Sequence, residues 1–165
     1  MTILGIDPGL ATTGYGLIET SRSSEFVCIH YGSIRSDADE ALWQRLKKIY
    51  DGILSIIRAY QPDQVAFEDV FYGHNVQTAI KLGQARGAAV IAAINAGVEI
   101  AAYSPREVKQ ALTGFGAASK EQVQRMVRDL LKLKEPATPM DASDALAVAI
   151  CHAQRWWTKQ KTEYL

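Results

Sequence analysis

The sequence predicts an α/β fold, a mixed five-stranded sheet with helices on both faces. Two observations support this prediction: three strand-like segments precede the first helical pattern, and strand and helix patterns then alternate. The chain has 165 residues, of which 48% are hydrophobic and 22% charged. Those values fit one compact domain that folds without a disulfide or a structural metal ion.

The first three strands are predicted from apolar and β-branched runs separated by turn residues. Ile3–Ile6 ends at the turn signal Asp7-Pro8-Gly9, and Thr13–Thr20 and Phe26–Ile34 follow. Because the connections are short, we expect these strands to be consecutive and antiparallel.

A change to helical period follows. Apolar residues recur every three or four positions from Asp39 to Tyr60, which predicts an amphipathic helix ending before Pro62. A short buried strand is predicted over Val65–Phe67, with Glu68-Asp69 directly after it.

The next helix is predicted from Val76 to Gly97, with Asn75 as its N-cap. Small residues lie along one side, where a neighbouring sheet or helix can approach closely: Ala79, Gly83, Gly87 and Ala88. A fifth strand over Val98–Tyr103 precedes three helices, predicted at about 105–112, 120–133 and 140–156. The N-cap signals of the first two are Ser104-Pro105 and the capping box Ser119/Gln122.

Charge is unevenly distributed although the net charge is zero. Residues 1–70 hold 6 basic and 10 acidic residues, a net of −4, and residues 71–165 hold 12 and 8, a net of +4. Between Lys81 and Lys134, nine basic residues face four acidic ones. One surface of a neutral protein can therefore attract a polyanion.

Several classes of protein are disfavoured. Only Cys28 and Cys151 occur, without the spacing of a redox motif or a zinc site. No apolar stretch approaches the roughly 20 residues of a membrane span, and residues 1–9 lack the basic start of a secretion signal. We expect a cytoplasmic protein.

Four acidic residues stand at strand ends or at a helix start: Asp7, Glu68, Asp141 and Asp144. If the first and fourth strands are parallel neighbours, Asp7 and Glu68 emerge side by side at one sheet edge. Asp141 and Asp144 share a helix face. Clustered carboxylates repel one another unless cations hold them, and hard divalent ions prefer oxygen ligands. The pattern therefore indicates a metal-dependent nuclease.

Other interpretations of these acids stay open from the residues alone. Asp7 could begin a turn, and Asp141 could favour the helix dipole in a first turn capped by Thr138. Glu68 and Asp69 point to opposite faces, and either could enter a cleft. Asp144 opens an apolar helix and needs a partner or a metal ion if it is buried.

Four ordered blocks resemble the RuvC family of crossover junction endodeoxyribonucleases. They are Gly5-Ile6-Asp7-Pro8-Gly9 with Thr13-Gly14-Tyr15-Gly16, Glu68-Asp69-Val70-Phe71, Leu82-Gly83-Gln84-Ala85-Arg86-Gly87, and Asp141-Ala142-Ser143-Asp144-Ala145-Leu146-Ala147. The resemblance implies an RNase H-like nuclease domain over residues 1–152, followed by a tail of unknown role over 153–165. The tail contains Trp156-Trp157, which matches no family pattern.

The implied activity is structure-selective cleavage of Holliday junctions in DNA recombination and repair, by symmetric two-metal-ion hydrolysis that leaves 5′-phosphates. The four catalytic acids would be the metal ligands: Asp7 would bridge two Mg²⁺ ions, Glu68 would hold one, and Asp141 and Asp144 the other. Mn²⁺ would substitute for Mg²⁺. The family pattern selects Glu68 over Asp69.

The resemblance also implies a set of DNA-contacting residues: Phe71, Tyr72, Arg86, Lys109 and Lys120. Phe71 would stack on bases at the junction, although it could also be a core aromatic. Arg86 could contact phosphate or form a structural ion pair, and the two lysines could be solvated. The side of the helix that carries Ala79, Gly83 and Gly87 would lie near a homodimer interface, or would pack on the sheet.

The implied partners are four-way junction DNA, a second copy of the chain and the RuvA–RuvB branch-migration complex. Three rival functions are weighed: an actin-like ATPase or sugar kinase, which 165 residues are too few to build; an RNase H-like nuclease acting on ribosomal RNA precursors; and a junction-binding module without activity. The four acids and the Phe71 block favour the junction nuclease.

Overall fold

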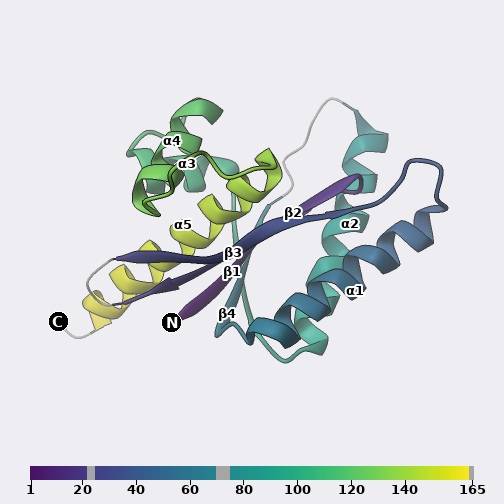
Figure 1. The fold of residues 1–165 in the computed structure, drawn as a ribbon, viewed down its shortest axis with the longest axis horizontal. Helices are drawn as coiled ribbons and strands as arrows, with labels where there is room; N and C mark the ends of the chain where they lie inside the picture. The colour runs from purple at the N-terminus through teal and green to yellow at the C-terminus, as the bar shows by residue number, and fades with distance from the viewer. Residues whose placement is uncertain (22–24, 70–74, 164–165) are drawn as a thin grey trace.

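The computed structural model describes residues 1–21, 25–69 and 75–163 (Figure 1). The element order confirms the predicted alternation. The strands are β1 (Thr2–Asp7), β2 (Thr12–Thr20), β3 (Phe26–Arg35), β4 (Gln64–Glu68) and β5 (Glu99–Tyr103), and the helices are α1 (Leu42–Tyr60), α2 (Val76–Asn95), α3 (Pro105–Thr113), α4 (Lys120–Leu130) and α5 (Met140–Glu163).

The five strands form one mixed sheet in the order β3-β2-β1-β4-β5. The β1–β2 and β2–β3 pairs are antiparallel, as expected for short connections, and β4 lies parallel to both β1 and β5. Ile6 pairs with Phe67 in the β1–β4 ladder, so the next residues, Asp7 and Glu68, end neighbouring parallel strands at the same edge. The parallel pairing on which the predicted site depends is thus confirmed.

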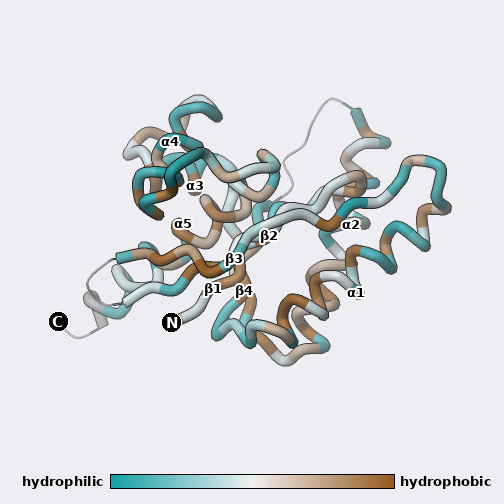
Figure 2. The backbone as a smooth tube through the Cα atoms, in the orientation of Figure 1, coloured by the Kyte–Doolittle hydropathy of each residue, from teal (hydrophilic) through white to brown (hydrophobic). Residues whose placement is uncertain are grey.

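Helices cover both faces of the sheet (Figure 1). Side chains alternate along the strands, so Ile3 packs with α3, α4 and α5 on one face, while Leu4 and Ile6 pack with α1 and α2 on the other. Hydrophobic residues colour much of the central strands, whereas the segment between β3 and α1 is mostly hydrophilic (Figure 2). Two core layers therefore hold the sheet between helices.

Helix α5 approaches the sheet unusually closely because β1 and β2 present glycines beneath it. A Cβ placed on Gly14 would lie 2.0 Å from the backbone oxygen of Asp141, and one on Gly5 would lie 2.0 Å from that of Ala145. At Gly16 the added atom would meet Leu146 at 2.6 Å. These contacts determine how close the start of α5, which carries Asp141 and Asp144, lies to the sheet.

The capping predictions are confirmed, and several boundaries differ. The side chains of Asn75, Ser104 and Ser119 accept hydrogen bonds from the first-turn amides of α2, α3 and α4. Helix α1 begins at Leu42 rather than Asp39, because residues 37–40 form a turn. Helix α4 ends at Leu130 rather than Leu133, since Lys132 takes a left-handed conformation with φ of 53°.

The final helix is longer than expected, since α5 continues past Trp156 to Glu163. Both tryptophans are half-buried, and the Trp157 indole N–H donates to Thr20 Oγ1 at 3.2 Å. The tandem tryptophans therefore pack on the domain, near the end of β2. Within the described ranges, no helix is long and apolar enough to cross a bilayer.

The small-residue side of α2 does not pack on the sheet. The buried residues of α2 are Ala85, Ala89, Ala92 and Ala93, which contact the layer formed with α1. Cβ atoms added at Gly83 or Gly87 would meet nothing within 4 Å. The buried alanines therefore make the close contact between α2 and the core, and Gly83 and Gly87 face open space on another side of the helix.

Replacement of Gly14 by alanine tests the close approach of α5. The new methyl group would overlap backbone atoms, which cannot swing aside as a side chain would, so we expect the free energy of unfolding to fall by about 1–3 kcal/mol or more. Ser55→Ala, at an exposed position on α1, is the control and should change stability by no more than about 0.5 kcal/mol. Urea unfolding measures both; equal stabilities would show that the contact does not constrain α5.

Candidate active site

Two of the predicted acids end neighbouring strands on the face of the sheet that α5 covers. Asp7 lies on the same side of β1 as Ile3 and Gly5, and Glu68 lies on the same side of β4 as Ala66. Asp7 is therefore not merely a turn residue, since its carboxyl hydrogen-bonds that of Glu68. The following turn is secured by buried Thr13, whose hydroxyl donates to the Gly9 carbonyl at 2.7 Å.

The other two acids lie near the start of α5, over β1 and β2. Helix α5 begins at Met140, so Asp141 is its second residue and Asp144 its fifth. The glycine contacts beneath the helix bring both side chains toward Asp7, and each raises the pKa of Asp7 through charge repulsion. The structure thus brings together all four acids that the sequence singled out.

Charge repulsion and burial dominate the electrostatics of the cluster. Burial first, and then the charges of Glu68, Asp144 and Asp141, raise the pKa of Asp7 from 3.8 to about 8. Burial and Asp144 raise the pKa of Glu68, and burial raises that of Asp144. A hydrogen bond between the Asp7 and Glu68 side chains raises the pKa of Asp7 further.

Two lysines share a cleft with the acids. A cavity of about 210 Å³ is lined by Glu68, Pro105, Val108, Lys109, Lys120, Val123, Asp144 and Ala147. Lys120 Nζ lies 3.4 Å from Asp144 Oδ2, and this pairing raises the pKa of Lys120. The charges of Lys120 and Lys109 also oppose the upward shift of the Glu68 pKa. The carboxylates are thus only partly neutralised by the chain itself.

The donor set fits a hard divalent cation in type and charge, since it consists of carboxylate oxygens from three elements. Within the described residues, no three His, Cys, Asp or Glu side chains are arranged so that they would hold a metal ion as they stand. Asp7 is hydrogen-bonded to Glu68, and Asp144 is paired with Lys120. A bound cation would compete with both contacts.

The structure distinguishes Glu68 from its neighbour Asp69. Asp69 Oδ1 accepts a hydrogen bond from Arg86 Nη2 on α2 at 2.6 Å, whereas Glu68 faces the α5 side. Arg86 therefore has the ion pair that the sequence left open as an alternative to a phosphate contact. Phe71 and Tyr72 lie outside the described residues, and no structural statement concerns them.

Three features of the site were missed by the sequence reasoning. Gly5, Gly14 and Gly16 permit the approach of α5, the Thr13 hydroxyl ties the turn after Asp7, and Lys120, although largely exposed, pairs with an acid. The glycines carried a signal, because they alternate with apolar residues in predicted strands, where glycine often marks a close backbone approach. The pairing of Lys120 had none, since 24 residues separate it from Asp144.

Sequence comparison finds one family over almost the whole domain. The family model described as "Crossover junction endodeoxyribonuclease RuvC" matches residues 3–152. Relatives of that name from Desulforamulus reducens and Geobacter sulfurreducens are 51% and 52% identical. Each alignment covers 93% of this chain, and 94% and 92% of the respective relatives.

Solved structures agree with the sequence comparison. The chain is similar to Thermus thermophilus RuvC in complex with a Holliday junction substrate, with a TM-score of 0.92, 36% identity and 96% of each chain covered. The yeast mitochondrial Holliday junction resolvase Ydc2 matches with a TM-score of 0.67 and 12% identity, over 97% of this chain and 82% of its own. The second likeness concerns the fold alone, which is RNase H-like.

The raised pKa of Asp7 predicts how stability depends on pH without divalent ions. The folded state keeps a proton that the unfolded chain releases near pH 3.8, so the contribution of Asp7 is fully present below that pH and is lost as pH rises through about 8. Asp7→Asn should remove this slope and, in EDTA at pH 8, unfold at a higher temperature than wild type. Mg²⁺ should raise the unfolding temperature of wild type more than that of the variant.

The matched control is Asp51→Asn, which changes an exposed acid on α1. This control should keep the wild-type dependence on pH. Parallel unfolding profiles for wild type and Asp7→Asn between pH 4 and pH 9 would contradict the assignment of the raised pKa to Asp7.

Proposed function

The chain belongs to the RuvC family of crossover junction endodeoxyribonucleases, and we propose that it resolves Holliday junctions at the cleft formed by Asp7, Glu68, Asp141 and Asp144. The observation that carries this proposal is the convergence of all four acids at one edge of the sheet, beside Lys109 and Lys120. That arrangement combines ligands for cations with positive charges for a phosphodiester.

The proposed cofactor is Mg²⁺, with two ions in each site and Mn²⁺ as a substitute. Asp7 interacts with all three other acids, so we assign it as the shared ligand, with Glu68 on one side and the α5 acids on the other. Bound divalent ions would supply an activated water and would stabilise charge on the attacking and leaving oxygens. The product proposed is a nick with a 5′-phosphate.

The residues of the chain then have distinct tasks. Rigid strand ends and the first two turns of α5 hold the four carboxylates, so little rearrangement of backbone is needed when the scissile phosphate arrives. Asp144 would be a cation ligand, and the Lys120 ammonium beside the cleft would then be available to contact a phosphate oxygen. Lys109, which lines the same cleft, provides a second contact.

A homodimer is proposed for paired cleavage, with α2 at its interface. One stripe of this helix carries exposed apolar side chains together with Gly83 and Gly87: Val76, Ile80, Ile91 and Ile94. The apolar residues would be buried by a second copy, and the glycines would allow its backbone to come close. Two such sites related by a two-fold axis match the symmetry of a four-way junction.

The wider setting is also proposed from family membership. The enzyme would act in DNA recombination and repair in the cytoplasm, where bacterial junction DNA is found. The RuvA–RuvB branch-migration complex would be its partner. Phe71 and Tyr72 are proposed to contact bases near the crossover.

Asp7→Asn should separate binding from cleavage. Loss of the shared ligand removes transition-state stabilisation of several kcal/mol, so we expect cleavage to fall by about 1,000-fold or more, while junction affinity changes little. The measurement is Mg²⁺-dependent cleavage of a mobile synthetic four-way junction beside a linear duplex of the same sequence.

Symmetric nicks in the junction alone, absent with Asp7→Asn, are the expected result. Asp51→Asn is the control for the loss of a carboxylate elsewhere and should cut normally. Tight junction binding without cleavage by wild type in Mg²⁺ or Mn²⁺ would argue for a binding module. Preferential cutting of structured RNA would argue for an RNA-processing enzyme.

Ile91→Glu should disrupt the dimer. A charge placed in the apolar stripe of α2 must be desolvated at the interface, so we expect a monomer at micromolar concentration in sedimentation experiments. Cleavage by this variant should give single nicks instead of paired ones. Val27→Glu, at an exposed apolar position on β3, is the control and should remain dimeric. A dimer that survives Ile91→Glu would place the interface elsewhere.

A further inference from the structure

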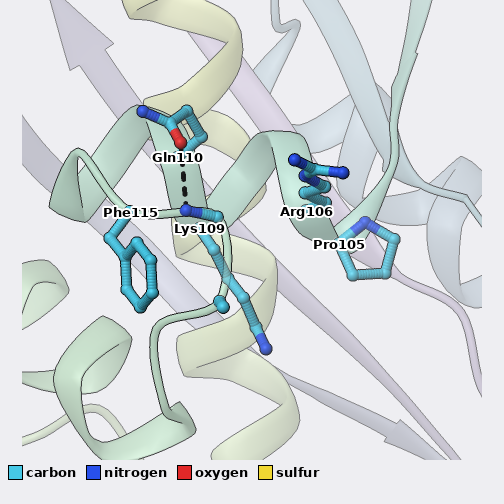
Figure 3. Close-up of a pocket in the computed structure, with 7 residues that line it drawn as sticks. Pro105, Arg106, Lys109, Gln110 and Phe115 are labelled. Carbon is cyan, nitrogen blue, oxygen red and sulfur yellow. Dashed lines mark hydrogen bonds between the residues drawn. The ribbon is translucent and has the colours of Figure 1, made fainter.

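A groove beside the catalytic cleft presents an exposed aromatic ring between basic side chains. Its volume is about 570 Å³, and its lining comes from α3 and the loop that follows: Pro105, Arg106, Lys109, Gln110, Phe115, Gly116 and Ala117 (Figure 3). Phe115 is 62% exposed. An exposed aromatic ring offers a face on which a nucleic acid base can stack.

The loop that carries Phe115 is braced rather than loose. The Gln110 side chain donates to the Gly114 carbonyl at 2.7 Å and accepts from the Gly116 amide at 3.0 Å, the contact dashed in Figure 3. The Thr113 hydroxyl accepts from the Phe115 amide at 3.1 Å. Gly114 has a φ of 74°, which a side chain would strain. The ring is therefore presented by an ordered backbone.

Arg106 and Lys109 give the groove its positive charge. In the parts of the chain that the structure describes, neither has a carboxylate within ion-pair distance. The nearby acid Glu107 is occupied elsewhere, because it accepts from Ser104 and pairs with Arg155. Arg106 also packs against Gly116, where an added Cβ would lie 2.9 Å from Arg106 Cγ. The Arg106 side chain thus lies against the loop, across the groove from Phe115, with no carboxylate within ion-pair distance among the described residues.

The groove continues into the cleft that holds the acids. Pro105 and Lys109 line both cavities. A linear polymer bound beside Glu68 and Asp144 could therefore extend into the groove. Alternating phosphates and flat rings are what a nucleic acid strand offers to such a surface. The positive charge, the exposed aromatic ring and the continuity with the cleft together favour a nucleic acid strand as the ligand of this groove.

We propose, on the premise of the proposed function, that this groove binds the junction strand next to the cut site, with Phe115 stacked on a base and Arg106 and Lys109 on phosphates. Phe115 and Arg106 are then DNA-binding residues outside the carboxylate cluster. Gln110 acts through the loop and positions the ring.

The test measures junction affinity in EDTA by fluorescence anisotropy, and cleavage in Mg²⁺ under single-turnover conditions. Phe115→Ala should weaken binding by about 10-fold, within the range of one lost base stack. Phe115→Tyr should restore affinity, whereas Phe115→Leu should not, because it keeps apolar volume without an aromatic face. Arg106→Gln should weaken binding and reduce the slope of log affinity against log salt by about one, and Arg106→Lys should preserve that slope.

Matched controls come from α1, on the other face of the sheet. Trp43→Ala removes a 75% exposed aromatic side chain, and Arg58→Gln removes an exposed cation. Both should bind and cut like wild type. The unfolding temperature of each variant monitors the fold, and 2-aminopurine in the strand beside the cut site should lose its binding-dependent fluorescence change with Phe115→Ala.

The outcomes separate the two proposals. Wild type that binds and cuts the junction, with Phe115→Ala and Arg106→Gln behaving identically to it, would overturn the groove assignment alone and favour a protein partner on this surface. Rescue by Phe115→Leu as complete as by Phe115→Tyr would overturn stacking. Wild type that neither binds nor cuts the junction would overturn the proposed function and the groove with it.

Discussion

The close contact between α5 and the first two strands is the constraint on which the site depends. The backbone of α5 lies so near Gly14 and Gly5 that one methyl group at either position would overlap it. Only this approach places Asp141 and Asp144 within electrostatic reach of Asp7. Fold and site therefore share one packing contact, and the residues that allow it carry no chemistry themselves.

The cluster formed by this contact is electrostatically unfavourable on its own. Several half-buried carboxylates repel, and the chain offsets part of this repulsion through the hydrogen bond between Asp7 and Glu68 and through the Lys120–Asp144 pair. The second contact is easily exchanged, because an exposed lysine moves away at little cost. Under the proposed function, a divalent cation would relieve the repulsion, and the lysine would be available to a phosphodiester.

The two faces of the sheet differ in what they expose. The α5 side holds the acids, the lysines and the groove beside Phe115, whereas α2 on the other side exposes an apolar stripe, where we have proposed the dimer interface. Consecutive residues at the end of β4 illustrate the division, since Glu68 turns to the cleft and Asp69 to Arg86 on α2. Alternation along a strand thus sends neighbouring acids to opposite faces of the sheet.

The sequence by itself determined the order of elements, the helix caps and the four acids, because periodicity, caps and strand-end residues depend on neighbours close in the chain. Tertiary structure alone paired Lys120 with Asp144 and turned Gly83 and Gly87 outward, and it placed Glu68 rather than Asp69 in the cleft, as the family pattern had implied. It also decided that Gly14 lies beneath Asp141. These features join residues up to 127 positions apart, and such distant contacts follow from how the helices pack on the sheet, which local patterns do not encode.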